Sequence, residues 1–304
     1  MMRKFKIGIP VITPDGKELL PAGTVVTGEV IKDLIASNNR SVKTYPIFDH
    51  VSLKKDLREF LSTPPYNTIF SDKGEAEDLF TFIDDIKVIE PILQFMDYFK
   101  ENDFYTYRHI LVVFALTTML SRLILPGYEK RLHDSIAGPA HDFGKICIPL
   151  EIMKKSTPLT RGEFRCVRHH TLAGYVLLSY YLKDSKNIAS VVARDHHEKL
   201  DGTGYPRGIQ RIHPMVEIIA VSDIYDALIA DRPYRPVSYD NRSALEELTE
   251  MAEAGKASSN VVRALIARNR GNRPDHRKFH LSLAKRGKAP ENNNYGIRKE
   301  DKKD

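Results

Sequence analysis

The sequence predicts a mainly α-helical protein with a small α+β module at its N-terminus and a flexible, basic tail at its C-terminus. From about residue 76 to about residue 268, apolar residues recur three and four positions apart, as on one face of a helix. Before residue 50 the apolar runs are short and alternate with turn sequences. From Arg268 onward this periodicity ends, and twelve Lys/Arg stand against five Asp/Glu. We therefore expect four parts: the module at 1–50, a helical connector at 51–100, the main helical domain at 101–267 and the tail at 268–304.

The N-terminal module is expected to contain hairpins, a helix and an edge strand. The turn sequence TPDG separates short apolar runs within residues 5–26, which is a hairpin pattern. Thr27 can cap a helix over residues 28–37. The segment VKTYPIF at 42–48 predicts a short strand, which its proline restricts to the edge of a sheet. The module is too short for most ligand-sensing domains, so we expect it to serve interaction or dimerisation.

The composition indicates a soluble globular protein, because 42% of the residues are hydrophobic and 28% are charged. The longest apolar run, residues 110–120, is much shorter than the roughly 20 residues that span a bilayer, so it predicts a buried helix and no membrane span. The N-terminal sequence meets a turn before a long apolar stretch develops, which argues against a secretory signal and favours the cytoplasm. Two cysteines are too few for a disulfide framework, and we expect Cys147 and Cys166 to fill the core.

Histidines and aspartates recur at nearly even intervals through the helical region. Successive groups lie 32, 28, 26 and 26 residues apart, about the length of a helix plus its connection: His109, His141-Asp142, His170, His196-His197 and Asp223. Helices of a bundle can direct such side chains at one interior point, as metal sites in bundles do. A carboxylate such as that of Asp142 has two oxygens and can bridge two cations, while neutral imidazoles complete each coordination shell.

Each of these residues taken alone would predict little. A single histidine on an apolar helix is more often a hydrogen-bonded core residue than a ligand. His169 is rotated about 100° from His170 on a helix and is not expected to bind a metal. The repetition of the same residue types at even intervals is what favours a metal site, because neither core filling nor solvation requires it.

At these residues the chain resembles the HD-GYP family, the branch of HD-domain phosphohydrolases known to hydrolyse the bacterial second messenger cyclic di-GMP. The resemblance covers about residues 100–255 and rests on four segments: AHDFGKICIP at 140–149, HHTLAG at 169–174, HHEKLDGTGYPRGI at 196–209 and VSDIYDALIADRPYRP at 221–236. It implies the helical bundle of an HD domain. It also implies that the chain is a cyclic di-GMP phosphodiesterase.

The resemblance assigns residues to two metal ions and to the substrate. His109, His141, Asp142 and Asp223 would hold one ion, and Asp142, His170, His196 and His197 the other, with Asp142 as the bridge. Lys145 matches the lysine near the scissile phosphate, and four further positions match residues that approach the dinucleotide: Gly204, Tyr205, Arg232 and Arg235. Asp201, Asp226 and Glu198 are expected to support the ligands and the loop without binding a metal.

The implied reaction uses two divalent transition-metal ions, iron first, with manganese, nickel or zinc as alternatives. A metal-bound hydroxide would attack the phosphodiester, with Asp142 and Lys145 as the catalytic residues. Tyr105 stands where family members with a third metal carry glutamate, so we expect two ions and linear pGpG as the product, with GMP following only after a second cut. Val112 and Thr171 also depart from the family pattern and are expected to alter packing more than chemistry.

Two other functions stay open at this point. The first is a receptor or adaptor that binds cyclic di-GMP, or a protein partner through the GYP loop or the N-terminal module, with little turnover. The second is an HD phosphohydrolase for nucleoside tri- or monophosphates, against which the GYP loop and the RPYR segment count. The basic tail could attract nucleic acid or an anionic membrane surface, although a solvated terminus is favoured.

Overall fold

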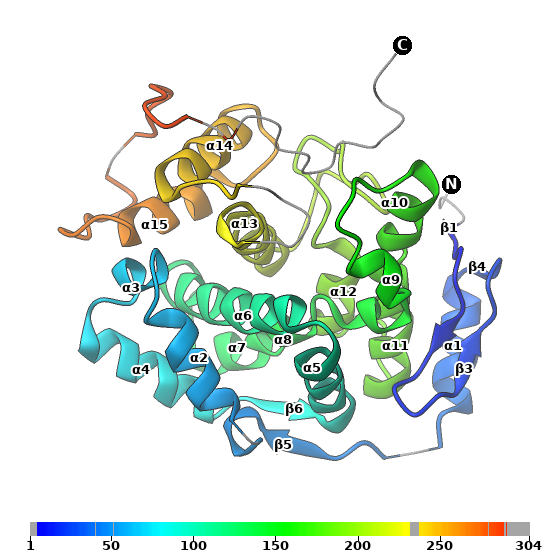
Figure 1. The fold of residues 1–304 in the computed structure, drawn as a ribbon. Helices are drawn as coiled ribbons and strands as arrows, with labels where there is room; N and C mark the ends of the chain where they lie inside the picture. The colour runs from blue at the N-terminus through cyan, green and yellow to red at the C-terminus, as the bar shows by residue number, and fades with distance from the viewer. Residues whose placement is uncertain are drawn as a thin grey trace, which may run out of the picture.

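A computed structural model describes residues 5–39, 41–50, 52–231, 237–278, 280–288 and 290, and it confirms the mainly helical fold (Figure 1). A long central helix, α6 (Phe104–Ile124), packs against α5 (Glu90–Asn102) and α8 (Ala137–Ala140) on one side and α13 (Pro214–Ile229) on the other. Next to these lie α11 (His170–Leu182) and α12 (Ile188–Asp195), which pack closely on each other. The peripheral helices are α7 (Tyr128–Ser135), α9 (Leu150–Met153), α10 (Arg161–Arg168), α14 (Asn241–Glu253) and α15 (Ser259–Arg268).

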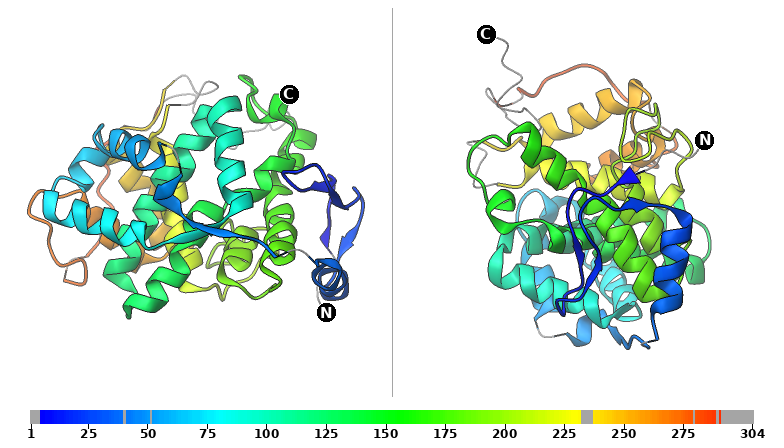
Figure 2. Two further views of the ribbon diagram at one scale, coloured as in Figure 1. Left: turned by 90° about the horizontal axis from the view of Figure 1, so that it is seen from below. Right: turned by 90° about the vertical axis from the view of Figure 1, so that its right-hand side faces the viewer.

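The predicted hairpins and helix of the N-terminal module are present. Strand β1 (Phe5–Lys6) pairs with β4 (Val25–Val26), and β2 (Val11–Ile12) pairs with β3 (Glu18–Leu20), both antiparallel. Helix α1 (Gly28–Ser37) begins at Thr27, whose hydroxyl accepts a hydrogen bond from the Val30 amide. The hairpins and α1 lie along α11 at one side of the molecule (Figure 2), where the Asn38 amide donates to the Tyr180 carbonyl over 2.7 Å.

The predicted edge strand is β5 (Thr44–Pro46), and its partner is a strand that the helical pattern did not reveal. Residues 76–99 have helical spacing throughout, yet β6 (Lys87–Ile89) interrupts them between α4 (Lys73–Asp84) and α5. Pairing with β5 supplies the backbone hydrogen bonds of β6, and a proline in the first turn of α5 restarts the helix. The rest of the connector forms a 3₁₀ turn, η1 (Ile47–Asp49), and the helices α2 (Leu53–Leu61) and α3 (Tyr66–Ile69).

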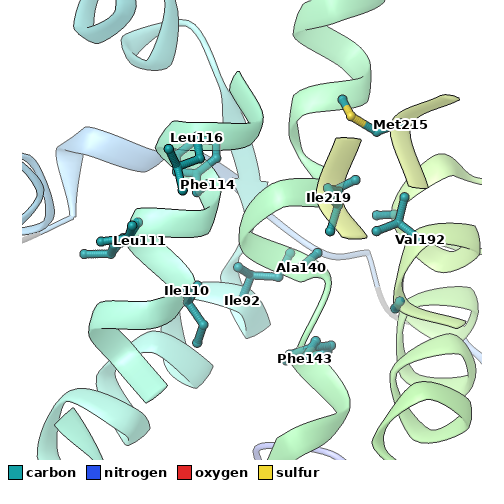
Figure 3. Close-up of a cluster of buried hydrophobic side chains, with 14 of the residues drawn as sticks. Ile92, Ile110, Leu111, Phe114, Leu116, Ala140, Phe143, Val192, Met215 and Ile219 are labelled. Carbon is teal, nitrogen blue, oxygen red and sulfur yellow. The ribbon is translucent and has the colours of Figure 1, made fainter. Parts of the chain in front are cut away.

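One apolar core lies between α5, α6, α8, α12 and α13, and Figure 3 shows part of it. Ile92, Ile110, Phe114 and Ile219 are fully buried there. Phe143 packs its ring edge-on against Phe95, with ring centroids 5.3 Å apart. This core holds the helix ends that carry the candidate metal-binding histidines in rigid positions.

Helix α6 is, by length and composition alone, apolar enough to cross a membrane, with a mean hydropathy of 1.3 over its most apolar window. Within that window 78% of the residues are buried inside the protein, which is the environment of a core helix. In the described parts of the chain, no other helix is both long and apolar enough to cross a membrane.

Beyond α15 the described residues of the tail form neither helix nor strand. Part of this segment lies on α14, where the Glu246 carboxylate accepts hydrogen bonds from the backbone amides of Arg286 and Gly287. Lys285 pairs with Glu250 on the same helix over 2.7 Å. The flexibility of the tail stays a prediction.

Candidate metal centre

The fold brings all seven predicted ligand residues to one place. His109 comes from α6, His170 is the first residue of α11, and Asp223 lies on α13. His141 and Asp142 follow α8 directly, at the start of a 3₁₀ turn, η2 (Phe143–Cys147), and His196 and His197 follow α12. Six of the seven side chains are buried or nearly so, and His197 is partly exposed. Helix ends therefore supply most of this site, because a side chain there can point along the axis into the bundle.

Close packing of η2 on α11 sets the position of Asp142. A Cβ atom at Gly144 would lie 1.9 Å from the carbonyl oxygen of His170 and 2.4 Å from the amide nitrogen of Gly174. Only glycine allows the two backbones to approach this closely. The approach places Asp142, just before η2, beside His170 at the start of α11.

The two oxygens of the Asp142 carboxylate face different histidines. Oδ2 lies 3.2 Å from Nε2 of His141 and 3.7 Å from Nε2 of His109. Oδ1 lies 3.5 Å from Nε2 of His170 and 3.8 Å from Nε2 of His196. We call His109, His141 and Asp223 the first group, and His170, His196 and His197 the second group. Asp142 thus stands between two sets of ligand atoms, as a bridging carboxylate would.

Hydrogen bonds behind the histidines fix which ring nitrogen faces the site. The Nδ1 atoms of His141, His170 and His196 each lie 2.6–3.1 Å from backbone carbonyl oxygens, so they donate their protons there. The Nδ1 atom of His109 donates to the Asp226 carboxylate over 2.6 Å. The Nε2 atoms of these four histidines therefore face the site, and in the neutral imidazole each carries the lone pair that a metal ion needs.

The electrostatics of the centre also fit cations. Burial alone would raise the pKa of Asp142, but Lys145 and His141 hold it well below its usual range. Burial lowers the pKa of His170 to about 3 and that of His196 to about 4, so both stay neutral and able to bind a metal at ordinary pH. The Nε2 atom of His141 is buried and has no hydrogen-bond partner among the described residues. A buried acceptor of this kind, aimed at a carboxylate, fits the donor set of a cation site.

Asp223 and Asp226 lie one helical turn apart on α13 and act on opposite nitrogens of His109. Oδ1 of Asp223 is 3.0 Å from Nε2, on the side of the site, and Asp226 holds Nδ1 from behind. The Oδ2 atom of Asp223 lies 3.9 Å from Nδ1 of His197. Asp226 also accepts from Arg108 over 3.1 Å and from the hydroxyl of Tyr66.

The loop after His197 is held by the buried carboxylate of Glu198. Its oxygens accept hydrogen bonds from the backbone amides of Arg207, Gly208 and Ile209 at 2.5–3.1 Å. Arg207 also pairs with Asp195 over 2.6 Å. Asp201 caps its own turn by accepting from the amide and hydroxyl of Thr203, and so braces the loop.

Tyr205 lies between a histidine and an arginine. Its ring stacks on that of His197, with centroids 4.7 Å apart, and the Arg168 guanidinium lies 4.1 Å from its centroid. A Cβ at Gly204, the preceding residue, would lie 2.3 Å from the amide nitrogen of Lys199, so glycine is required for this turn. The stacked Tyr205 covers the partly exposed face of His197.

The centre opens into a cavity of about 670 Å³. Among its lining residues are Lys145, Arg168, His196, Gly204 and Tyr205. The side chains of Ile152, Met153, Phe164 and Met251 add an apolar wall. The volume is within the range of about 300–1,000 Å³ that small-molecule sites occupy.

The structure places every candidate residue except two. Arg232 and Arg235 lie outside the described residues. Three contributors beyond the predicted ligands are apparent only in the structure: Tyr66, Arg108 and Arg168. The structure also shows how Glu198 acts, because its carboxylate accepts backbone amides of the loop. Tyr66 and Arg108 carry no motif, and only their proximity to Asp226 in the fold reveals them.

Comparison with known proteins identifies the family of this chain. The family model described as "HD domain" matches residues 87–259, which is more than half of the chain. The chain belongs to the HD-domain family. The motifs at Asp142, His170 and His196 then mark this HD domain as one of the HD-GYP type, as the resemblance implied.

Several curated relatives of the HD domain are named as cyclic dinucleotide phosphodiesterases. A cyclic di-GMP phosphodiesterase of Pseudomonas aeruginosa is 37% identical over 174 residues, which cover 55% of this chain and 40% of that protein. A cyclic di-GMP phosphodiesterase of Thermotoga maritima is 33% identical over 198 residues, covering 63% of this chain and 52% of that protein. A 3'3'-cGAMP-specific phosphodiesterase of Vibrio cholerae is 30% identical over 183 residues, covering 59% of this chain and 40% of that protein. The chain thus spans about half the length of these relatives or less.

One solved structure, of an HDG"Y"P protein from Bdellovibrio bacteriovorus, aligns with 86% of this chain and 94% of its own. The identity is 15% and the TM-score is 0.42. The assignment of site residues in this HD domain therefore rests on its own geometry.

Proposed function

We propose that this chain is a metal-dependent phosphodiesterase that hydrolyses cyclic di-GMP. The observation that carries the proposal is Asp142, whose two oxygens face two separate groups of histidines beside a cavity of about 670 Å³. A binuclear centre needs such a bridge, and a dinucleotide needs such a volume. The names of the curated relatives support the substrate class.

Each of the two groups, together with the shared Asp142, would hold one divalent transition-metal ion. The ligands would be His109, His141, Asp142 and Asp223 for the first ion, and Asp142, His170, His196 and His197 for the second. Mixed imidazole and carboxylate ligation suits iron, our first expectation, and also manganese, nickel or zinc. Such a pair of ions lowers the pKa of water and stabilises charge on phosphoryl oxygens.

The chain's own residues would bind and orient the substrate. Lys145 places its ammonium at the cavity, where it can neutralise a phosphoryl oxygen or protonate the leaving 3'-oxygen. Gly204 and Tyr205 line the cavity and are proposed to contact the dinucleotide. His197 and Arg168 cover the two faces of the Tyr205 ring, so a base would stack on the outer face of the Arg168 guanidinium. Arg232 and Arg235 are proposed to grip phosphate bidentately.

We propose linear pGpG as the product. Tyr105, four residues before His109, stacks on that ring with centroids 6.0 Å apart. An aromatic side chain therefore occupies the place from which a carboxylate would bind a further ion. The described geometry supports two ions, which are sufficient for one cut.

Further proposals concern the chain as a whole. We infer a cytoplasmic location and a division into the module, connector, catalytic domain and tail at the boundaries given above. A protein partner could bind the GYP loop or the N-terminal module. Binding of nucleic acid by the basic tail has only the tail's charge in its favour.

The test is hydrolysis by the purified protein, supplied anaerobically with Fe(II) or Mn(II), with cyclic di-GMP and 3'3'-cGAMP offered in parallel. Asp142→Asn should abolish turnover. Asp134→Asn, which alters another buried carboxylate paired with Lys130 away from the centre, should retain it. Metal-dependent formation of pGpG supports the proposal, and GMP as the main product contradicts the two-ion inference. Substrate binding by the metal-loaded protein without turnover would indicate a receptor, and turnover of 3'3'-cGAMP alone would change the substrate.

A further inference from the structure

We propose that Tyr66, in the connector, is a positioning residue for the first metal group and acts through Asp226 and His109. The inference rests on the proposed metal site but not on its substrate. Tyr66 is on α3, outside the region 87–259 that the HD-domain family model matches. The proposal therefore makes a segment beyond the family domain a working part of the centre.

The contacts form a continuous chain of hydrogen bonds. The Tyr66 hydroxyl donates to Oδ1 of Asp226, and the Oδ2 atom of the same carboxylate accepts the Nδ1 proton of His109 over 2.6 Å. The opposite nitrogen of His109 faces Asp142 and Asp223. The side chains of Tyr66, Asp226 and His109 are each at most 1% exposed, so water cannot easily replace a lost hydrogen bond.

Tyr66 and Arg108 together orient the Asp226 carboxylate. Arg108 donates to Oδ1 over 3.1 Å and lies over the Tyr66 ring, 5.2 Å from its centroid. With two donors on Oδ1, Oδ2 is left to accept from His109. Burial and Asp226 raise the pKa of Tyr66 well above its ordinary value, so the hydroxyl keeps the proton that it donates.

The position of Tyr66 is set from a second segment outside the family match. Arg273 donates to the carbonyl of Ile69 and the hydroxyl of Ser71, each over 3.1 Å. Arg268, at the end of α15, pairs with Glu75 over 2.6 Å. The connector around α3 is thus clamped by the start of the C-terminal tail. A displacement of either segment would reach the first metal group through Tyr66.

The test compares Tyr66→Phe with Tyr107→Phe in the full chain. Both are buried tyrosines that donate to a carboxylate, and Tyr107 lies two residues before His109 but donates to Asp56, away from the centre. Binding of Mn(II) alone is titrated to obtain two stepwise affinities, and thermal unfolding is measured in the metal-free state. Removing a carboxylate behind a metal-bound histidine typically weakens affinity about 10–100-fold, and Tyr66 is one contact further away, so we expect a loss of about 3- to 10-fold for one ion. Tyr107→Phe should leave both affinities unchanged.

Two backgrounds locate the weakened ion. With His197→Ala, which impairs the second group, Tyr66→Phe should still weaken the remaining ion, whereas with His141→Ala it should not. Equal affinities for wild type and Tyr66→Phe would overturn the inference, and so would an equal loss in Tyr107→Phe, which would point to general loosening of α6. A wild-type protein that binds fewer than two Mn(II) ions would instead overturn the proposed binuclear site. Failure to hydrolyse cyclic di-GMP leaves this measurement intact.

Discussion

The Lys145 ammonium lies 2.5 Å from Oδ2 of Asp142, the carboxylate that stands between the two histidine groups. This lysine is 16% exposed and faces the cavity, while Asp142 is almost fully buried. The pair therefore joins the metal centre to the space in which a substrate would lie. A lysine so placed can leave the carboxylate for a phosphate when cations occupy the site.

Replacing Lys145 by methionine should separate metal binding from turnover. Methionine keeps the apolar stem but removes the charge that would stabilise a phosphoryl oxygen, so we expect kcat to fall about 100-fold, as when a charge-stabilising donor is removed from other active sites. Metal content should be unchanged, because Asp142 loses a competing cation. Lys130→Met, which breaks a similar pair with Asp134, is the control and should behave as wild type. Loss of both ions from Lys145→Met would contradict this role.

Glu198→Gln should disturb the loop that carries Tyr205. The amide of glutamine would face backbone donors that the carboxylate now accepts, at a cost of about 1–3 kcal/mol in the free energy of unfolding. We expect KM to rise more than kcat falls, with both ions retained. Glu246→Gln also removes a carboxylate that accepts backbone amides, but it lies on α14 and should leave KM unchanged. An unaltered KM in Glu198→Gln would show that the loop does not depend on this carboxylate.

Gly204→Ala should have a similar effect for a steric reason. The added Cβ would meet backbone atoms of Lys199 and Glu198 at 2.3 and 2.4 Å, so the loop must move. We expect substrate affinity, measured with the metal-loaded protein, to fall at least about tenfold, which corresponds to about 1.4 kcal/mol. Gly28→Ala has open space around it and should have no effect on binding. Full affinity in Gly204→Ala would mean that the loop takes no part in binding.

The metal-free protein should lose stability as the pH falls from about 6.5 toward 4.5. In the unfolded chain a histidine takes up a proton near pH 6.5, but burial lowers the pKa of His170 to about 3, that of His196 to about 4, and that of His197 well below its ordinary value. Acid therefore favours the unfolded state at these three residues. Burial opposes the charge on His109, but Asp223 and Asp226 raise its pKa, so its stabilisation is fully present below pH 6.5 and changes little over this range.

The difference of up to about three protons between the unfolded and folded states corresponds to about 1–4 kcal/mol per pH unit. Urea unfolding at several pH values in the presence of a chelator measures it. In His196→Ala the slope of the unfolding free energy against pH should decrease by the contribution of about one proton. A free energy of unfolding that is constant or rises on acidification would contradict the neutral state of the buried histidines.

Much of the site could be predicted because its chemistry is local in sequence. The doublets His141-Asp142 and His196-His197, and the GYP loop after them, identify themselves by residue type and spacing. The helix at 28–37 was predicted correctly because its cap, Thr27, is adjacent to it. In these cases the interactions that decide the structure lie within a few residues of each other.

Long-range pairing is what the sequence pattern could not reveal. Strand β6 has the apolar spacing of a helix, and only pairing with β5, some 40 residues earlier, makes it a strand. Tyr66 carries no motif, and its contact with Asp226 spans 160 residues. From the sequence alone Arg168 would be taken for a surface charge, whereas in the structure its guanidinium lies over the ring of Tyr205.

The sequence by itself determined the helical class of this protein, the kind of ligands it offers and the family to which it belongs, because periodicity and motifs are properties of short segments. The tertiary structure alone decided that the two oxygens of Asp142 face different histidines, and that a connector tyrosine supports one of them. The physical reason is that coordination depends on distances of a few ångströms between side chains from separate helices. Packing of the buried core sets those distances, and no single segment of the chain encodes them.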